Sequence, residues 1–247
     1  MITGLNGTSS GDSTVSLVNM PRTARKPYTS ALRQAQARST RMLVLNAAGR
    51  LFAARGYVAT SVDDIAKAAG VGRATVFAAV GGKPVLLKQA YDVSLVGDDQ
   101  SISLVERPRS QAILAEPDAW RMLSGYAELV TEIAGRISGI YEAVRGASGS
   151  DPEARELWVE ILRQRRAGMD NLVRALTRKH TLREGLDATS AADLAWVVVD
   201  PGLYHMLVHQ RGWTPERYCA WLEETLQTQL LPGRPGRRRG SRGKRVR

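Results

Sequence analysis

The chain has 247 residues, of which 43% are hydrophobic, and a formal charge of +11. This length allows a substantial buried core, while the longest wholly apolar run, residues 194–199, is far shorter than the roughly 20 residues that a membrane helix needs. The first 20 residues lack the basic and apolar regions of a secretory signal, so we expect a cytoplasmic protein. The single cysteine, Cys219, excludes an internal disulfide framework and any multi-cysteine zinc site.

The positive charge is concentrated in three parts of the chain. Residues 1–42 contain six basic residues and one acidic residue, residues 43–88 have a net charge of +4, and residues 232–247 contain eight basic residues and no acid. Residues 89–231 carry a net charge of −6. A basic N-terminal third and a basic tail on an acidic body predict a polyanionic partner, which by composition alone could be DNA, RNA or an anionic membrane.

Both ends of the chain are predicted to be disordered basic arms. Residues 1–38 are rich in Gly, Ser and Thr, and residues 232–247 are rich in Pro, Gly and Arg. Between the arms, apolar residues recur with the period of a helix and not with that of a strand, which predicts an all-α fold. We divide this part into a small module over residues 39–88 and a larger helical body over residues 89–231.

Four helices are predicted in and just beyond the small module. The first runs from about residue 40 to residue 55, and the second begins at a cap provided by Thr60 or Ser61 and ends near Ala69. The third covers about residues 73–80, and the fourth begins near Lys83-Pro84 and runs to about Val96. On the first helix, the residues expected to share one apolar face are Leu43, Ala47, Leu51 and Ala54.

The body is predicted to consist of long helices at about 118–145, 152–180, 191–209 and 215–231, with an ambiguous segment at 98–117. Asp151-Pro152-Glu153 and Thr214-Pro215-Glu216 each supply a capping side chain, a proline and an acid in the order that a helix N-terminus favours. Asp200-Pro201-Gly202 should kink or split the third of these helices, because proline cannot continue a regular helix.

The second and third predicted helices have the residue spacing of a helix-turn-helix. Ala66 is small where the two helices would cross, Gly70 suits the tight turn, and Val76 would pack the third helix back on the second. A helical hairpin that only packs is the alternative for any one of these residues. The spacing as a whole, within a basic surrounding, favours DNA binding.

This stretch resembles the TetR family of transcriptional regulators. The residues that carry the resemblance are Ala47-Ala48, Leu51-Phe52, Gly56-Tyr57, Thr60-Ser61-Val62, Ile65-Ala66, Ala69-Gly70-Val71, Arg73-Ala74-Thr75-Val76-Phe77, Lys83 and Leu86. The resemblance implies a larger, all-helical effector-binding domain and a homodimer formed through residues 191–209 and 215–231. It also implies a repressor that an unknown small-molecule effector releases from double-stranded operator DNA.

The resemblance also implies which residues contact DNA. Arg73 could bind guanine or an unspecific phosphate, and Lys83 could bind phosphate or remain solvated. The chain departs from the family at Ala78 and Ala79, which cannot donate side-chain hydrogen bonds to phosphate, so binding could depend more on the basic arms. The expected DNA-binding residues are Thr60, Ser61, Gly72, Arg73, Ala74, Thr75, Phe77 and Lys83.

Aromatic residues of the body are candidates for lining an effector pocket, although core packing explains each of them equally well. They are Trp120, Tyr126, Tyr141, Trp158, Trp196 and Tyr204. His205 and His209 are spaced to share one helix face, but two histidines fall short of a usual metal site, and we expect no metal and no cofactor. We find no catalytic constellation. An effector-free architectural DNA-binding protein and an enzyme built on the helical body are the two rival interpretations.

Overall fold

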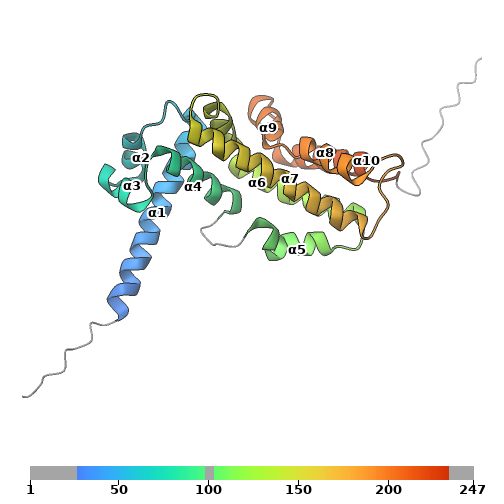
Figure 1. The fold of residues 1–247 in the computed structure, drawn as a ribbon, viewed down its shortest axis with the longest axis horizontal. Coiled ribbons are helices and arrows are strands. Elements are labelled where there is room, and N and C mark those ends of the chain that lie inside the picture. Colours follow the sequence, from blue (N-terminus) through green and yellow to red (C-terminus); the bar gives the residue numbers. More distant parts are fainter. Residues whose placement is uncertain (1–26, 98–102, 234–247) are drawn as a thin grey trace, which may run out of the picture. The chain divides into compact units, whose positions relative to one another are not determined.

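The structure, a computed structural model, describes residues 27–97 and 103–233 (Figure 1), and these ranges contain helices and turns but no β-strand. The predicted all-α fold is therefore confirmed. Most of the expected disordered arms, 1–38 and 232–247, lies outside the described residues. Ala37–Arg247 form a unit separate from Met1–Gln36, and the packing reported below is within the former.

The first helix, α1 (Pro27–Arg55), begins well before the predicted residue 40. The expectation of disorder is therefore wrong for residues 27–38, which are helical. Pro27 occupies the first helical position, where its missing N–H has no cost. The Ala, Leu, Arg and Gln residues that follow are strong helix formers. They form no apolar stripe, so hydrophobic periodicity does not predict this part of the helix.

The buried face of α1 also differs from the predicted one. Leu43 is 53% exposed and Ala54 is exposed, whereas Val44, Ala48 and Phe52 are fully buried. The buried residues are spaced four apart, as one face of a helix requires. The predicted face is therefore wrong at Leu43 and Ala54 but correct at Ala47, which is fully buried, and at Leu51, which packs against the same core.

Three shorter helices follow: α2 (Val62–Ala69), α3 (Arg73–Ala79) and α4 (Lys83–Val96). Pro84 lies in the first turn of α4, and Gly97 ends that helix in the left-handed region at φ 84°. Buried residues of α1, α2, α3 and α4 share one apolar core, which therefore holds the N-terminal helices together.

In the body, the ambiguous segment contains a 3-10 turn, η1 (Leu104–Glu106), and a short helix, α5 (Pro108–Ala115). Two long helices follow, α6 (Ala119–Ala147) and α7 (Pro152–Thr177), which lie side by side in Figure 1. The predicted cap of the second is confirmed, because the Asp151 carboxylate accepts a hydrogen bond from the backbone N–H of Ala154 at 2.9 Å.

The predicted interruption at Asp200-Pro201 is confirmed. The chain forms α8 (Ala188–Val198), then α9 (Pro201–Tyr204) and a π-helical turn, η2 (His205–Gln210), in place of one continuous helix. The last helix is α10 (Pro215–Leu230), whose predicted cap Thr214 accepts a hydrogen bond from the Arg217 N–H. α8 packs on α7, and α10 packs on α6 (Figure 1).

Two apolar cores hold the described residues together. The core of the N-terminal helices continues into Ile133–Val144 of α6 and Ala154–Ile161 of α7. The second core joins the remaining parts of α6 and α7 to α8, α9 and α10. Within the described ranges, no helix is both long enough and apolar enough to cross a membrane.

Candidate functional site

The turn between α2 and α3 is fixed by local hydrogen bonds. Ser61 caps α2: its hydroxyl accepts from the Asp64 N–H at 3.1 Å, and the Asp64 carboxylate accepts from the Ser61 N–H at 2.9 Å. These two bonds form a capping box. The Ser61 hydroxyl, 2.6 Å from the Asp64 carboxylate, and then the Ser61 N–H lower the pKa of Asp64. Gly70 ends α2 with φ 69°, a conformation that glycine adopts without strain. The two helices thus cross at the predicted turn.

Thr60, in contrast, does not have the predicted role. Its side chain is fully buried, and its hydroxyl donates to the backbone oxygens of Gly56 at 2.8 Å and Leu51 at 3.3 Å. A hydroxyl that is committed to two carbonyls inside the core cannot reach a phosphate. The expectation that Thr60 contacts DNA is therefore corrected: Thr60 anchors the α1–α2 turn, and Ser61 alone is the exposed cap.

The start of α3 presents a continuous exposed surface. Gly72, Arg73, Ala74, Thr75 and Phe77 are all exposed, and Phe77 remains 45% exposed despite its size. Val76, in the middle of this run, is fully buried in the core. One helix face thus holds α3 in place while the opposite face offers a guanidinium, a hydroxyl and an aromatic ring to a partner.

Two weak contacts position the Arg73 side chain on this surface. It pairs with the exposed carboxylate of Asp63, and its guanidinium lies 5.4 Å from the centre of the Phe77 ring. Exposed ion pairs contribute little to stability, so Arg73 can leave Asp63 for a nucleic acid at small cost.

Lys83, the first residue of α4, lies where the N-terminal helices meet the body. Its ammonium is 4.3 Å from the centre of the Tyr57 ring and 3.4 Å from the backbone oxygen of Val58. The Tyr57 hydroxyl donates to the Asp151 carboxylate at 3.0 Å, and burial raises the pKa of Tyr57, so this hydroxyl stays protonated. Lys83 and Ser61 both lie in the module that contains α3. Lys83 is half-buried, whereas Ser61 is exposed.

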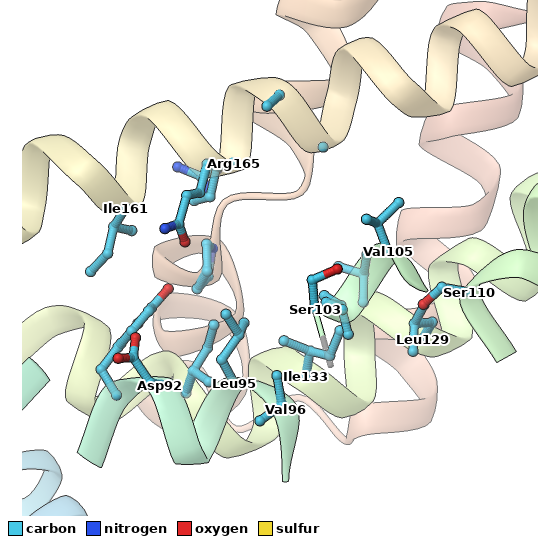
Figure 2. Close-up of a pocket in the computed structure, with 18 of the residues that line it drawn as sticks. Asp92, Leu95, Val96, Ser103, Val105, Ser110, Leu129, Ile133, Ile161 and Arg165 are labelled. Carbon is cyan, nitrogen blue, oxygen red and sulfur yellow. The ribbon is translucent and has the colours of Figure 1, made fainter. Parts of the chain in front are cut away.

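A cavity of about 1110 Å³ lies mainly in the body, with walls from α1, α4, η1, α5, α6, α7 and the α8–α9 junction. This volume is slightly above the range of about 300 to 1,000 Å³ that is typical of small-molecule pockets. Figure 2 shows Arg165 and Ile161 of α7 facing Asp92 and Leu95 of α4, with Val105, Ser110 and Leu129 further along. This cavity is a feature of the body that could bind a ligand.

The aromatic residues predicted to line an effector pocket are mostly packed elsewhere. Of the six, only Tyr126 lines this cavity. Tyr141 and Trp158 stack on each other with ring centres 4.9 Å apart, and Tyr204 packs against Tyr218 at the same separation. Trp120 and Trp196 pack against the second core. The wall of the cavity is instead mainly aliphatic.

Arg165 is the functional candidate that the sequence analysis missed. It lines the cavity, its side chain is only 11% exposed, and its guanidinium pairs with Asp200 at 2.8 Å. It lay within a run of arginines that is typical of a solvated surface. Its spacing could have identified it, because Arg165 is four residues from each of Ile161 and Met169, both buried.

His205 and His209 lie on the π-helical turn with ring centres 5.3 Å apart. Nε2 of His209 is 3.3 Å from the Ser138 hydroxyl. Among the described residues, no three His, Cys, Asp or Glu side chains gather closely enough to hold a metal ion.

A helix-turn-helix with an exposed second helix, joined to a helical body with a cavity, defines the fold class of helix-turn-helix regulators. Residues 44–90 match the family profile of bacterial regulatory proteins, tetR family. The predicted resemblance to the TetR family is thereby confirmed for this segment. No match is found among curated protein sequences.

Solved structures share the fold beyond this segment. A TetR-family transcriptional regulator from Rhodococcus sp. is 16% identical, with a TM-score of 0.60 over 77% of this chain and 98% of that one. A transcriptional regulator from Saccharomonospora viridis in complex with choline is 19% identical, with a TM-score of 0.60 over 78% and 98% of the two chains. FadR from Bacillus subtilis in complex with stearoyl-CoA is 20% identical, with a TM-score of 0.56 over 75% and 95%. At these identities the likeness establishes the fold alone.

Proposed function

We propose that this protein is a cytoplasmic, sequence-specific DNA-binding repressor that acts as a homodimer and leaves its operator when a small molecule occupies the body. The observation that carries the proposal is the exposed face of α3, which lies within the segment that matches the tetR family. The DNA-binding residues, the dimer and the effector are parts of this proposal, and so is the division into domains at residues 39–88 and 89–231. We infer a regulator and not an enzyme.

On DNA, the N-terminal end of α3 would enter the major groove. Arg73 can donate two hydrogen bonds to guanine, while the Thr75 hydroxyl and methyl can meet a phosphate or thymine. Phe77 offers an apolar contact, and Ser61 and Lys83 are placed to approach the backbone. Gly72 and Ala74 leave room for the close approach of α3 to the groove.

The dimer would form through α8, α9, η2 and α10, the elements that cover the predicted segments 191–209 and 215–231. These elements leave large apolar side chains exposed, since Val197 is 56% exposed and Met206 46% exposed. Exposed apolar side chains gathered on neighbouring elements are typical of interfaces. A symmetric pair would set its two α3 helices about 34 to 36 Å apart, the spacing of successive major grooves.

The cavity suits the role of an effector site because α4 connects it to the helix-turn-helix. Leu86 and Leu87 of α4 are buried in the N-terminal core, while Leu95 and Val96 of the same helix line the cavity. A ligand would act by preferring one position of α4, and its effect is limited by its differential affinity for the two states. Solved structures of this fold that hold choline or stearoyl-CoA support a ligand in the body.

The proposal is tested by fluorescence anisotropy of the full-length protein with duplex DNA from its own upstream region and with a scrambled duplex, at two salt concentrations. The expected result is a preference for the upstream duplex that persists at high salt and after deletion of residues 232–247. Electrostatic binding by the basic arms is sequence-independent and weakens with salt. Equal, salt-sensitive binding to both duplexes that is lost on deletion of the tail would support the architectural alternative instead.

A further inference from the structure

The wall of the cavity combines an aliphatic surface with an excess of positive charge. Its apolar lining contains only two aromatic residues, Tyr91 and Tyr126, among many Val, Leu, Ile and Ala side chains. A flexible alkyl chain fits such a wall better than a flat polycyclic ring, which gains from aromatic partners. The charged residues among those described in the lining are four arginines and one carboxylate, Asp92. Asp92 is paired with Lys88 at 2.7 Å, and Arg163 of the lining is paired with Glu160 at the same distance.

Arg165 is the cation placed to hold a head group inside the cavity. Its Nη1 contacts the Tyr141 hydroxyl at 3.0 Å and Asp200 at 2.8 Å, and its Nη2 donates to the backbone oxygen of Trp196 at 2.8 Å. These contacts involve only the two terminal nitrogens, so the Nε edge of the guanidinium can serve a further acceptor.

The Asp200 carboxylate that pairs with Arg165 serves three groups in all. It accepts hydrogen bonds from the Tyr141 hydroxyl at 2.9 Å and from the Gly202 N–H at 2.7 Å, besides pairing with Arg165. The guanidinium also lies 4.9 Å from the centre of the Trp196 ring, which stabilises the cation without supplying a negative charge.

Two polar side chains of the cavity lining, Gln89 and Tyr91, bear on the choice of head group. Oε1 of Gln89 is buried and accepts no hydrogen bond in the described structure, although Gln89 lines the cavity. Tyr91 also lines the cavity, and burial raises the pKa of its hydroxyl, which therefore remains a neutral donor. A carboxylate can accept a hydrogen bond from the Tyr91 hydroxyl, but it has no hydrogen to donate to Oε1 of Gln89.

Resting on the proposed function, in which this cavity holds the effector, we propose that the effector is a carboxylate with a single aliphatic chain whose head group binds Arg165. The chain lies along the wall formed by Leu95, Val96, Leu129 and Ile133, toward Val105 (Figure 2). Charge-assisted, two-pronged hydrogen bonds to arginine make a carboxylate the favoured head group.

The test is isothermal titration calorimetry of the full-length protein with dodecanoate, dodecyltrimethylammonium and butyrate, all below micelle-forming concentrations. We expect dodecanoate to bind roughly tenfold or more tightly than dodecyltrimethylammonium, and butyrate, which lacks the long chain, to bind too weakly to detect. Equal binding of the cation and the carboxylate, or no binding of either, would overturn the proposal.

The head-group contact is tested by the double variant Arg165→Met/Asp200→Asn, which removes both charges together and so leaves neither buried alone. The matched control is Arg166→Met/Asp193→Asn, which removes an ion pair between α7 and α8, away from the cavity lining. We expect the first variant to lose roughly tenfold or more of the affinity for dodecanoate, and the control to keep it. Unchanged dodecanoate binding in the first variant would overturn the proposal.

A cavity-filling variant, Ile133→Trp, tests the chain site without touching Arg165 and should abolish dodecanoate binding. Dodecanoate binding that persists in this variant would contradict the assigned chain site.

Anisotropy with upstream DNA separates the two proposals. If dodecanoate binds but the DNA affinity does not fall, the effector-release function fails and the ligand site stands. If the protein selects its upstream DNA but no aliphatic carboxylate binds, the ligand class fails and the regulator stands.

Discussion

The helix-turn-helix and the cavity are made of the same kind of element, but they are assembled over different distances in the sequence. The DNA-binding candidates other than Thr60 come from one stretch, Ser61 to Lys83, and local caps and turns fix their positions. The cavity draws its wall from segments as distant as Gln89 and Pro201. A contiguous motif can be altered one exposed residue at a time, whereas the cavity depends on how four or more helices pack.

The largest expected effect is on the free energy of unfolding. It distinguishes a core residue from a surface residue of the N-terminal helices, because the chain has two phenylalanines, one in each position. Phe52 is fully buried beside Tyr57, with ring centres 5.8 Å apart, and Phe77 is 45% exposed. Phe52→Ala should lower the free energy of unfolding by about 3 to 5 kcal/mol. Phe77→Ala should change it by less than about 0.5 kcal/mol and weaken DNA binding. Urea denaturation and anisotropy measure the two effects, and equal losses of stability would contradict this division.

The next effect concerns reading of the DNA sequence. Arg73→Ala should weaken binding to the operator by about 1 to 3 kcal/mol while binding to scrambled DNA changes less, because a two-pronged contact to guanine is lost. Arg121→Ala removes an exposed arginine from α6 and serves as the control. A uniform loss on both duplexes would mean that Arg73 contacts only phosphate.

A close approach between α1 and α6 joins the two regions. A Cβ at Gly139 would lie 2.7 Å from the Cβ of Ala53, so Gly139→Ala forces the helices apart and should cost about 1 to 3 kcal/mol. A Cβ at Gly146, on the same helix, would meet nothing within 4 Å. Gly146→Ala should therefore stabilise the protein by about 0.5 to 1 kcal/mol. Thermal denaturation of the pair tests the contact, which would be refuted if Gly139→Ala were as stable as the wild type.

The smallest effect is pH-dependent. The Ala154 N–H, and then the Tyr57 hydroxyl, lower the pKa of Asp151. Because this folded-state pKa is depressed, the stabilisation is present above the ordinary value of about 3.9 and is lost as the pH falls through the lowered pKa.

Asp151→Ala should therefore cost about 0.5 to 2 kcal/mol at neutral pH, with the difference from the wild type narrowing in acid. Asp187→Ala, which removes the comparable cap of α8, is the control without a tyrosine partner. Urea denaturation at several pH values measures both. A difference that stays constant down to strongly acidic pH would contradict the role of the Asp151 charge.

Sequence reasoning was most accurate where structure is determined locally. The turn at Gly70, the caps Ser61, Asp151 and Thr214, and the interruption at Pro201 each follow from a few neighbouring residues, and the structure contains them all. The start of α1 was missed because it depends on helix propensity and not on an apolar stripe.

The cavity could not be predicted because its composition follows from long-range packing. Aromatic residues such as Tyr141 and Trp158 pack against each other in the core, while smaller aliphatic residues line the cavity. The burial of the Thr60 side chain, within the helix-turn-helix, could not be predicted for the same reason. Its neighbour Ser61 is equally suited by type to cap a helix, and only the fold decides which of the two hydroxyls turns inward.

The most direct test of a DNA-reading α3 is selection from a library of randomised duplexes by the wild-type protein and by Arg73→Ala. We predict that the wild type enriches an inverted repeat whose half-sites are about one helical turn apart, or a multiple of it. Arg73→Ala should lose the preference at one symmetric pair of positions in that repeat. Enrichment of no motif by the wild-type protein would contradict the claim that the exposed face of α3 reads DNA sequence.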